Sequence, residues 1–327
     1  MKKIVNFFGA PTEIFRTLND KAGAYARSLG MEYQWQIQDP FQQSDVIRSL
    51  READAGIIDI EPYGEEIFSR LGGRTKLLIR FGVGYDKVDL AAATRRHIAV
   101  ARTTGANTDA VAEMALSLLL SAKRHICIDN DMVRAGKWEK DVVHELIGSC
   151  VGIVGFGAIG KRLAKLLQGF DCKILAYDPF PDQEAAARYG VAFADLDSLL
   201  SEADAVSLHV PLTGETKGMI SHAQLDRMKP WSVIVNTSRG GIIDEEALYE
   251  ALKNRTIGGA GIDVFAQEPL PAASPLRTLD NVILTPHNSS QTEEALWNIY
   301  KMAIDICKDY FDRGTSPHIL NPEANER

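Results

Sequence analysis

Three residues in the second half of the chain could together move a proton and hold a carboxylate. They are Arg239, Glu268 and His287. A guanidinium can grip a carboxylate through two parallel hydrogen bonds and polarise a keto oxygen. Histidine exchanges protons near neutral pH, and a neighbouring carboxylate favours the imidazolium and orients the ring. Each residue alone has an ordinary explanation as a surface charge, a turn residue or a loop histidine. Together they fit hydride transfer at C2 of a 2-hydroxy or 2-keto acid, provided that a dinucleotide binds nearby.

A glycine-rich turn upstream predicts such a dinucleotide site. The turn follows the apolar run 151–154, precedes a helical stretch, and consists of Gly155, Phe156, Gly157, Ala158, Ile159 and Gly160. Gly155 permits the tight turn, Gly157 lets a pyrophosphate approach the backbone, and Gly160 lets helix and strand pack closely. Asp178 ends the next predicted strand and can accept hydrogen bonds from ribose hydroxyls. Its charge would repel a 2′-phosphate, so the sequence favours NAD over NADP.

Composition excludes several other classes of protein. A chain of 327 residues suits two domains, and 45% hydrophobic residues are ordinary for a globular protein. The net charge of −8 opposes binding to nucleic acid or to an anionic membrane. No apolar stretch approaches the roughly 18 residues of a membrane helix, and the short apolar run near the N-terminus is expected to be a strand rather than a secretory signal. The four cysteines lie far apart, which predicts free thiols, no metal site and a cytoplasmic location.

Short apolar runs alternate with amphipathic stretches along the chain, which predicts parallel sheets flanked by helices. The first series of strands is expected at 3–8, 55–60, 76–81 and 98–101. A second series is expected at 151–154, 173–177, 205–209, 232–236, 259–264 and 282–285. Two long helices are predicted, at 107–124 between the series and at 292–311 near the C-terminus. If the last helix packs on the first domain, the second domain is an insertion in it.

The chain resembles the D-isomer-specific 2-hydroxyacid dehydrogenases, a family that includes phosphoglycerate, glycerate, D-lactate and formate dehydrogenases. Besides the residues above, the matching stretches are 82–89, 107–113, 136–138 and 209–213. The resemblance covers nearly the whole chain. It implies an α/β fold in which a Rossmann-type, doubly wound parallel sheet for NAD is inserted into a smaller flavodoxin-like α/β substrate domain. The NAD-binding domain would span 103–289, and the substrate domain 1–102 and 290–327.

The family also implies roles for individual residues. Arg239, Glu268 and His287 would form the catalytic set, and the backbone at Val83 and Gly84 would receive the substrate carboxylate. Further contacts with the cofactor are expected at Thr108, His209, Val210, Pro211, Thr237, Ser238 and Asp263. Asp263 would lie near the nicotinamide amide, whereas His209 is expected to cap a strand edge rather than transfer protons. A homodimer is expected through the cofactor domain, with a contribution from the helix at 107–124.

Departures from the family pattern bear on the substrate. The segment 288–290 after the catalytic histidine is Asn-Ser-Ser, which is more polar than usual. Glu61, near the end of the second predicted strand, would repel a phosphate where phosphoglycerate enzymes tend to carry an arginine. Arg80 is either an anion holder or a brace for its loop. The chain ends soon after its last helix, so no appended regulatory domain is expected. These features favour a small, non-phosphorylated acid.

Three alternatives stay open at this level. The first is phosphoglycerate dehydrogenase activity. The second is a non-catalytic NADH-binding sensor or co-regulator on the same fold, because fold alone does not fix function. The third keeps the redox chemistry but changes the substrate to formate or phosphite. The intact set of Arg239, Glu268 and His287 weighs against the sensor. No pocket residue typical of formate or phosphite enzymes stands out in the sequence.

Overall fold

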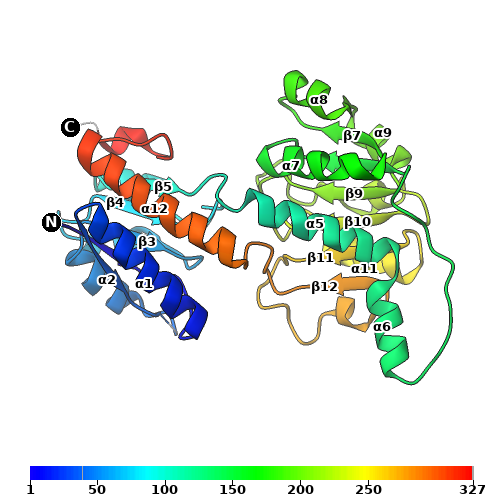
Figure 1. The fold of residues 1–327 in the computed structure, drawn as a ribbon, viewed down its shortest axis with the longest axis horizontal. Helices are drawn as coiled ribbons and strands as arrows, with labels where there is room; N and C mark the ends of the chain where they lie inside the picture. The colour runs from blue at the N-terminus through cyan, green and yellow to red at the C-terminus, as the bar shows by residue number, and fades with distance from the viewer. Residues whose placement is uncertain (39, 326–327) are drawn as a thin grey trace. The chain divides into compact units, whose positions relative to one another are not determined.

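A computed structural model describes residues 1–38 and 40–325, which form two compact units (Figure 1). The split unit comprises Met1–Asn107 together with the chain from Thr292 onwards, and the inserted unit comprises Thr108–Gln291. The boundaries expected from the sequence, after 102 and after 289, lie a few residues from these. The last two residues of the expected substrate domain, 326 and 327, lie outside the described residues.

The split unit contains a five-stranded parallel sheet with the order β2-β1-β3-β4-β5. Its strands are β1 (Lys2–Asn6), β2 (Met31–Trp35), β3 (Ala55–Ile58), β4 (Leu77–Arg80) and β5 (Ala99–Arg102). Its helices are α1 (Glu13–Ser28), α2 (Gln43–Arg51), α3 (Glu65–Arg70), α4 (Leu90–Arg95), α12 (Glu293–Arg313) and the 3-10 turn η3 (Pro322–Asn325). This strand order is the flavodoxin-like one, as expected.

Alternate residues of these strands enter two separate cores, because successive side chains of a strand point to opposite faces. Ile57 and Ile79 pack with residues of α1 and α12, whereas Ile58 and Leu78 pack with residues of α2, α3 and α4. Tyr300 of α12 is fully buried in the first core. The C-terminal helix therefore packs on the sheet formed by the N-terminal third of the chain, which confirms the insertion.

The inserted unit contains a seven-stranded parallel sheet with the order β12-β11-β10-β9-β6-β7-β8. Its strands are β6 (Cys150–Val154), β7 (Lys173–Tyr177), β8 (Val191–Phe193), β9 (Ala205–Leu208), β10 (Val233–Asn236), β11 (Gly259–Ile262) and β12 (Val282–Leu284). From β6 the order runs through β7 and β8 on one side and through β9 to β12 on the other. This is the doubly wound order, and ligands of such sheets bind where the order reverses, outside the carboxyl ends of the strands.

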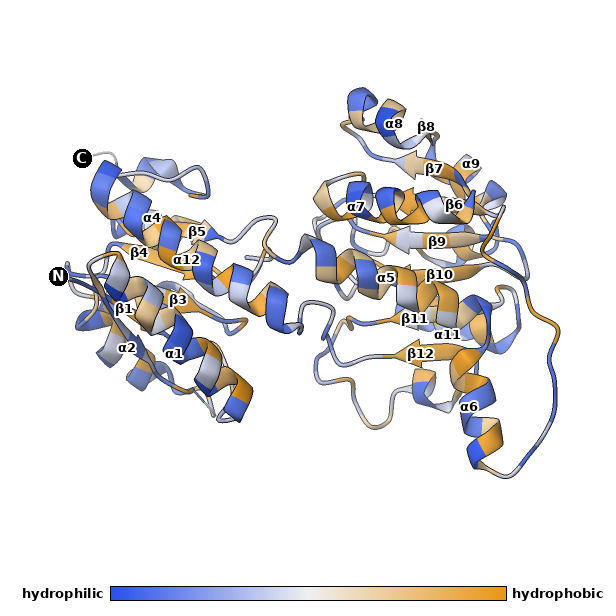
Figure 2. Ribbon diagram, in the orientation of Figure 1, coloured by the Kyte–Doolittle hydropathy of each residue, from blue (hydrophilic) through white to orange (hydrophobic). Residues whose placement is uncertain are grey.

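Helices cover both faces of this sheet, so its strands are apolar over most of their length (Figure 2). One core takes in residues of α5 (Thr108–Lys123), α7 (Ala158–Leu166) and α8 (Gln183–Tyr189). The opposite core takes in residues of α9 (Leu196–Glu202), α10 (His222–Leu225) and α11 (Glu245–Lys253). The remaining elements are α6 (Ile126–Arg134) and the 3-10 turns η1 (Leu167–Phe170) and η2 (Pro275–Thr278).

The apolar helix predicted at 107–124 is α5, and most of its apolar side chains pack inside the inserted unit. Ala112, Ala115, Leu118 and Leu119 are buried in the core that α5 shares with α7 and the sheet. The next helix, α6, differs because it has no buried residue. Among the described helices, none is long and apolar enough to cross a membrane.

Candidate active site

The ends of three adjacent strands place Arg239, Glu268 and His287 at one edge of the inserted sheet. Arg239 follows β10, Glu268 follows β11 and His287 follows β12. The strands are parallel and in register, with Asn236 opposite Ile262 and Ile262 opposite Leu284. Their carboxyl ends therefore coincide, at the edge where ligands of such sheets bind.

His287 and Glu268 form a hydrogen-bonded pair. Nδ1 of His287 lies 2.8 Å from Oε2 of Glu268, whose other oxygen, Oε1, accepts the backbone N–H of Phe265 at 3.0 Å. The carboxylate is thus fixed by the backbone on one side and holds the imidazole on the other. In the neutral ring this arrangement places the proton on Nδ1 and leaves Nε2 to exchange a proton with a ligand. His287 also has φ of 53°, an uncommon conformation for a residue other than glycine.

Asp263 holds the loop that carries His287. Its buried carboxylate accepts the Thr285 hydroxyl at 2.6 Å, the N–H groups of Asn288 and Ser289 at 3.0 Å each, and the Ser289 hydroxyl. The backbone N–H of His287 donates to the Asp263 carbonyl at 2.8 Å. These bonds compensate the desolvation of the charge and fix the loop. Sequence reasoning missed this role, although the unusual polarity of Asn288 and Ser289 was its signal.

The loop of Arg239 is fixed in a similar way by a buried side chain. Asn236 accepts the Ser238 N–H at 3.0 Å and the Ser238 hydroxyl at 2.7 Å, and it donates to the Arg239 carbonyl at 2.9 Å. Gly240 packs on the backbone of the neighbouring loop, where a Cβ atom would lie 1.9 Å from the Phe265 carbonyl oxygen. The arginine loop is therefore packed directly against the loop that carries Glu268.

The glycine turn is tightly packed at two of its glycines and open at the third. Gly155 has φ of +97°, and a Cβ there would lie 2.6 Å from the His209 carbonyl oxygen. A Cβ on Gly160 would lie 2.3 Å from the Gly155 carbonyl oxygen, so close packing demands glycine at both positions. Gly157, by contrast, faces open space at the N-terminus of α7. Phe156, Ala158 and Ile159 complete the turn.

Asp178 is fixed next to this turn at the end of β7. One of its oxygens accepts the N–H of Phe156 at 2.7 Å and the other accepts the N–H of Phe180 at 2.8 Å. Each oxygen keeps a further lone pair for a ribose hydroxyl. The nearby cation Lys161 already forms an ion pair with Asp182, at 2.5 Å. This edge therefore suits a ribose with free hydroxyls better than one with a 2′-phosphate.

Two buried polar atoms at the same edge have no partner among the described residues. They are Nδ1 of His209, just after β9, and Oγ1 of Thr237, just after β10. Nε2 of His209 lies 2.9 Å from the Ser207 hydroxyl, and burial lowers the pKa of His209 to about 4. The ring is therefore neutral and fits the expected role of a strand-edge residue rather than a proton donor. Unpaired buried polar atoms beside an open glycine turn fit a site for a polar ligand such as a dinucleotide.

The other residues predicted to contact the cofactor lie in the same unit. Val210 and Pro211 follow His209, Ser238 follows Thr237, and Thr108 begins α5. Val83 and Gly84 belong to the split unit, in the loop after β4. Arg80 precedes that loop and lies 3.8 Å from Asp59, so it has the carboxylate partner expected of a brace.

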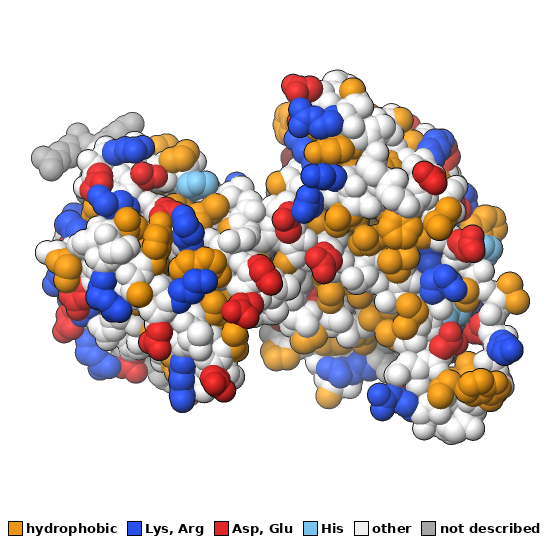
Figure 3. All heavy atoms as spheres, in the orientation of Figure 1, with side chains coloured by type: hydrophobic (Ala, Val, Ile, Leu, Met, Phe, Trp, Pro, Cys, Tyr) orange, Lys and Arg blue, Asp and Glu red, His pale blue; other side chains and the backbone are white. Residues whose placement is uncertain are grey.

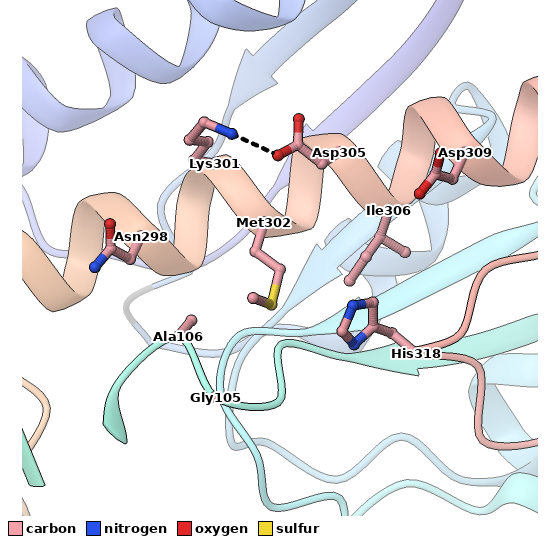
Figure 4. Close-up of a pocket in the computed structure, with 9 residues that line it drawn as sticks. All are labelled: Gly105, Ala106, Asn298, Lys301, Met302, Asp305, Ile306, Asp309 and His318. Carbon is pink, nitrogen blue, oxygen red and sulfur yellow. Dashed lines mark hydrogen bonds and ion pairs between the residues drawn. The ribbon is translucent and has the colours of Figure 1, made fainter. Parts of the chain in front are cut away.

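A separate cavity of about 420 Å³ lies in the split unit beside α12 (Figure 4). Met302 and Ile306 contribute apolar side chains to it, and Asp305 lies in its wall, paired with Lys301 at 2.7 Å and with the Tyr25 hydroxyl at 2.6 Å. Its lining includes none of the predicted site residues. Among the described residues, no group of three or more potential ligands could hold a metal ion.

Comparisons with known proteins show the family to which the chain belongs. Residues 116–289 match the family described as D-isomer specific 2-hydroxyacid dehydrogenase, NAD binding domain. The chain is 44% identical to D-3-phosphoglycerate dehydrogenase of Synechocystis sp. over 83% of its length, but it spans only 50% of that protein. It is 41% identical to glyoxylate reductase of Thermococcus litoralis, covering 85% of the chain and 87% of that protein.

A solved structure is similar over almost the whole chain. The NAD-dependent formate dehydrogenase of Staphylococcus aureus, in complex with NAD, superposes with a TM-score of 0.82 at 31% identity, over 98% of this chain and 99% of that one. The chain belongs to the D-isomer-specific 2-hydroxyacid dehydrogenase family. It is an NAD-dependent oxidoreductase of the class that acts on CH–OH donors.

The position of Asp178 leads to a prediction about cofactor choice. We expect Asp178→Asn to keep the acceptor for the Phe156 N–H but to lose the charge. NADH should bind about tenfold more weakly, because a hydrogen bond to a charged group contributes about 1.5–3 kcal/mol. NADPH should lose less affinity than NADH, or gain some, because the repulsion of its 2′-phosphate is removed. Fluorescence titration of both dinucleotides measures this, and an unchanged ratio of the two Kd values would contradict the assignment.

Proposed function

We propose that this protein transfers a hydride between NAD and C2 of a small, non-phosphorylated D-2-hydroxy acid or the matching 2-keto acid. The observation that carries the proposal is the pair of His287 and Glu268, 2.8 Å apart, which follow β12 and β11, the two strands next in order after β10, the strand that Arg239 follows. A proton mover, the group that orients it and a carboxylate holder are what this reaction requires of a protein. The glyoxylate reductase relative supports the same class of substrate.

Each residue then has a defined role. The Arg239 guanidinium holds the acid group of the substrate and polarises its keto oxygen. In reduction, Nε2 of His287 donates a proton to the oxygen on C2, and in oxidation it takes that proton back. Glu268 keeps the ring oriented and stabilises its protonated form. The nicotinamide, when bound, supplies or accepts the hydride. The residues proposed to hold the dinucleotide are those of the glycine turn with Asp178, Thr108, His209, Val210, Pro211, Thr237, Ser238 and Asp263.

The preference for a non-phosphorylated acid rests on charges at the carboxyl edge of the split sheet. Arg80 has Asp59 as its partner at 3.8 Å, and Glu61 follows in the same loop. A phosphate at that edge would meet two carboxylates and an arginine that is already paired. Phosphoglycerate dehydrogenase activity is the second candidate, because the Synechocystis relative carries that name.

The test is oxidation of NADH in the presence of glyoxylate, pyruvate, hydroxypyruvate, branched 2-keto acids and 3-phosphohydroxypyruvate. We expect turnover of one or more non-phosphorylated acids. A strong preference for the phosphorylated compound would overturn the interpretation of Glu61 and establish the second candidate. Tight binding of NADH without turnover of any acid would instead favour a sensor.

We also propose that the chain forms a homodimer through α6 and the segment 135–147 after it. Five apolar side chains there are strongly exposed: Ile126 (52%), Val133 (52%), Trp138 (81%), Val142 (101%) and Ile147 (62%). Figure 3 shows hydrophobic side chains at the surface of the inserted unit. Several large apolar side chains exposed within one segment favour an interface, and a symmetric pair is the commonest arrangement. The sequence predicted that α5 takes part in the dimer interface, whereas these exposed apolar residues lie after α5 in the chain.

We expect the double variant Trp138→Asp, Val142→Asp to be monomeric, because two charges would be buried in the interface. Phe180→Asp is the matched control, since Phe180 is 87% exposed in the same unit but outside this segment. Light scattering coupled to size-exclusion chromatography distinguishes the two states. A monomeric wild-type protein, or a double variant that remains dimeric, would refute this interface.

The four cysteines are free thiols, which is consistent with the reducing cytoplasm as the proposed location. Cell fractionation tests this, and recovery outside the cytoplasm would contradict it.

A further inference from the structure

The loop after β4 offers two successive backbone donors. Gly82 has φ of +121°, and Val83 and Gly84 follow it. Within the described part of the chain, the N–H groups of Val83 and Gly84 donate to no acceptor. Successive free N–H groups at a turn form a concavity that suits an anion. The family resemblance implied that this loop receives the substrate carboxylate, and the following inference rests on that expectation and on the proposed function.

The start of this loop is held by the next strand, independently of any charge. Thr103 is fully buried, and its hydroxyl accepts the Gly82 N–H at 2.9 Å and donates to the Gly82 carbonyl at 3.2 Å. The Thr103 N–H donates to the same carbonyl at 3.1 Å. Three bonds therefore fix the backbone at Gly82. Arg102, the residue before Thr103, is not needed to set that conformation.

Arg102 instead reaches the middle of the loop. Its Nη1 lies 3.5 Å from the Val83 carbonyl oxygen, at the long end of hydrogen-bond distances, and its guanidinium carbon lies 5.3 Å from the centre of the Tyr85 ring. The backbone of Arg102 is anchored by its N–H, which donates to the His318 carbonyl at 3.2 Å. A planar guanidinium over an aromatic ring is a favourable arrangement that holds the side chain in place.

The charge of Arg102 has no carboxylate partner in the described part of its unit. Arg80 is its register partner on β4, and Arg80 has Asp59 at 3.8 Å. Among the described residues, no carboxylate lies within ion-pair distance of Arg102. Its charge is half-buried and acts mainly on the groups it touches, namely the Val83 carbonyl and the Tyr85 ring.

The Val83 carbonyl and the Gly84 N–H belong to the same peptide group. A positive charge at the oxygen end draws electron density through the delocalised amide, and the N–H at the other end becomes a stronger donor. We propose that Arg102 is a positioning residue that strengthens binding of the substrate carboxylate by polarising the Val83–Gly84 peptide group. Arg102 thereby acts on the ground-state affinity for 2-keto acids and not on the proton transfer.

The test compares Arg102→Met and Arg102→Lys with the wild-type enzyme. Methionine keeps an apolar stem over the Tyr85 ring but removes the charge, and lysine restores the charge without the planar fork. Arg96→Met is the matched control, since Arg96 is a half-exposed arginine of the same unit that lies 3.7 Å from Glu65. Calorimetry measures binding of oxamate, a carboxylate analogue of pyruvate, to the complex with NADH, and steady-state kinetics measures KM and kcat.

For Arg102→Met we expect the Kd of oxamate and the KM of the 2-keto acid to rise about tenfold, the order of one hydrogen bond to a charged group. The value of kcat should change far less, and the Kd of NADH should not change. Arg102→Lys should recover part of the loss, and Arg96→Met should behave as wild type. A purely structural role would lower kcat, NADH binding and thermal stability together.

Unchanged oxamate binding in Arg102→Met would overturn the proposal, and so would a loss confined to kcat or one accompanied by unfolding. Failure of the proposed function looks different. In that case the wild-type protein would turn over none of the acids in the panel. Oxamate binding that depends on Arg102 would still support the role of this residue in holding a carboxylate, whereas a wild-type protein that binds no oxamate would refute it.

Discussion

Replacement of His287 by alanine is expected to lower kcat for 2-keto acid reduction by about 10²–10⁴-fold, the usual contribution of general acid–base catalysis. The physical reason is that His287 is the partner of Glu268 at 2.8 Å and is the proposed source of the proton for the oxygen on C2. NADH should bind with unchanged affinity, because the dinucleotide turn lies on other strands of the sheet. Single-turnover kinetics with NADH fluorescence measures both quantities.

Glu268→Gln tests whether Glu268 acts through its negative charge or only by orienting the His287 ring. The amide oxygen can still accept the Phe265 N–H, but the negative charge beside the imidazole is lost. We expect a loss of at least about tenfold in kcat, smaller than that of His287→Ala, because the protonated ring loses its stabilising partner. Turnover by His287→Ala within a few-fold of wild type would exclude His287 as the acid–base group. Equal melting temperatures of the variants and the wild type are the control for folding.

Replacement of Arg239 by leucine should lower kcat/KM by about 10²–10⁴-fold. Two hydrogen bonds from a guanidinium to a carboxylate contribute about 1.5–3 kcal/mol each, which corresponds to this range when both are lost. Arg239→Lys should restore only part of the activity, because an ammonium group lacks the planar fork that matches a carboxylate. Steady-state kinetics with the preferred acid of the panel measures the effect.

Arg255→Leu is the control for the loss of an arginine from the same unit. Arg255 is exposed and pairs with Asp280 at 2.8 Å, away from the predicted site residues in the sequence. It should leave kcat/KM unchanged. If Arg239→Leu lost no more activity than Arg255→Leu, the carboxylate would have to be held by another group.

The backbone architecture follows largely from the sequence. Buried parallel strands are covered on both faces, so β3, β4, β6, β9 and β10 appear as short apolar runs that can be recognised without a structure. The edge strands β2 and β8 escape this reasoning. Met31–Trp35 alternates buried or half-buried with exposed residues, and Val191–Phe193 has only three residues, so neither forms an apolar run.

The candidate catalytic residues also follow from the sequence, because Arg239 and His287 come directly after predicted strands and the glycine fingerprint precedes both. Parallel strands bring residues after their carboxyl ends to one edge, so spacing along the chain is enough to predict that they gather there. The nucleotide turn is predictable for the same reason, since Gly155, Gly157 and Gly160 form a local pattern.

Only the tertiary structure decided how these residues are held. The Asp263 carboxylate accepts hydrogen bonds from Thr285, Asn288 and Ser289. The side chain of Arg102, at the end of β5, reaches the Val83 carbonyl in the loop after the neighbouring strand β4. Such contacts join residues about 20 or more positions apart, and each depends on the exact rotation and register of neighbouring strands rather than on residue type. The sequence by itself therefore determined the fold and the chemical groups, whereas the hydrogen bonds that orient those groups emerged only when the chain was folded.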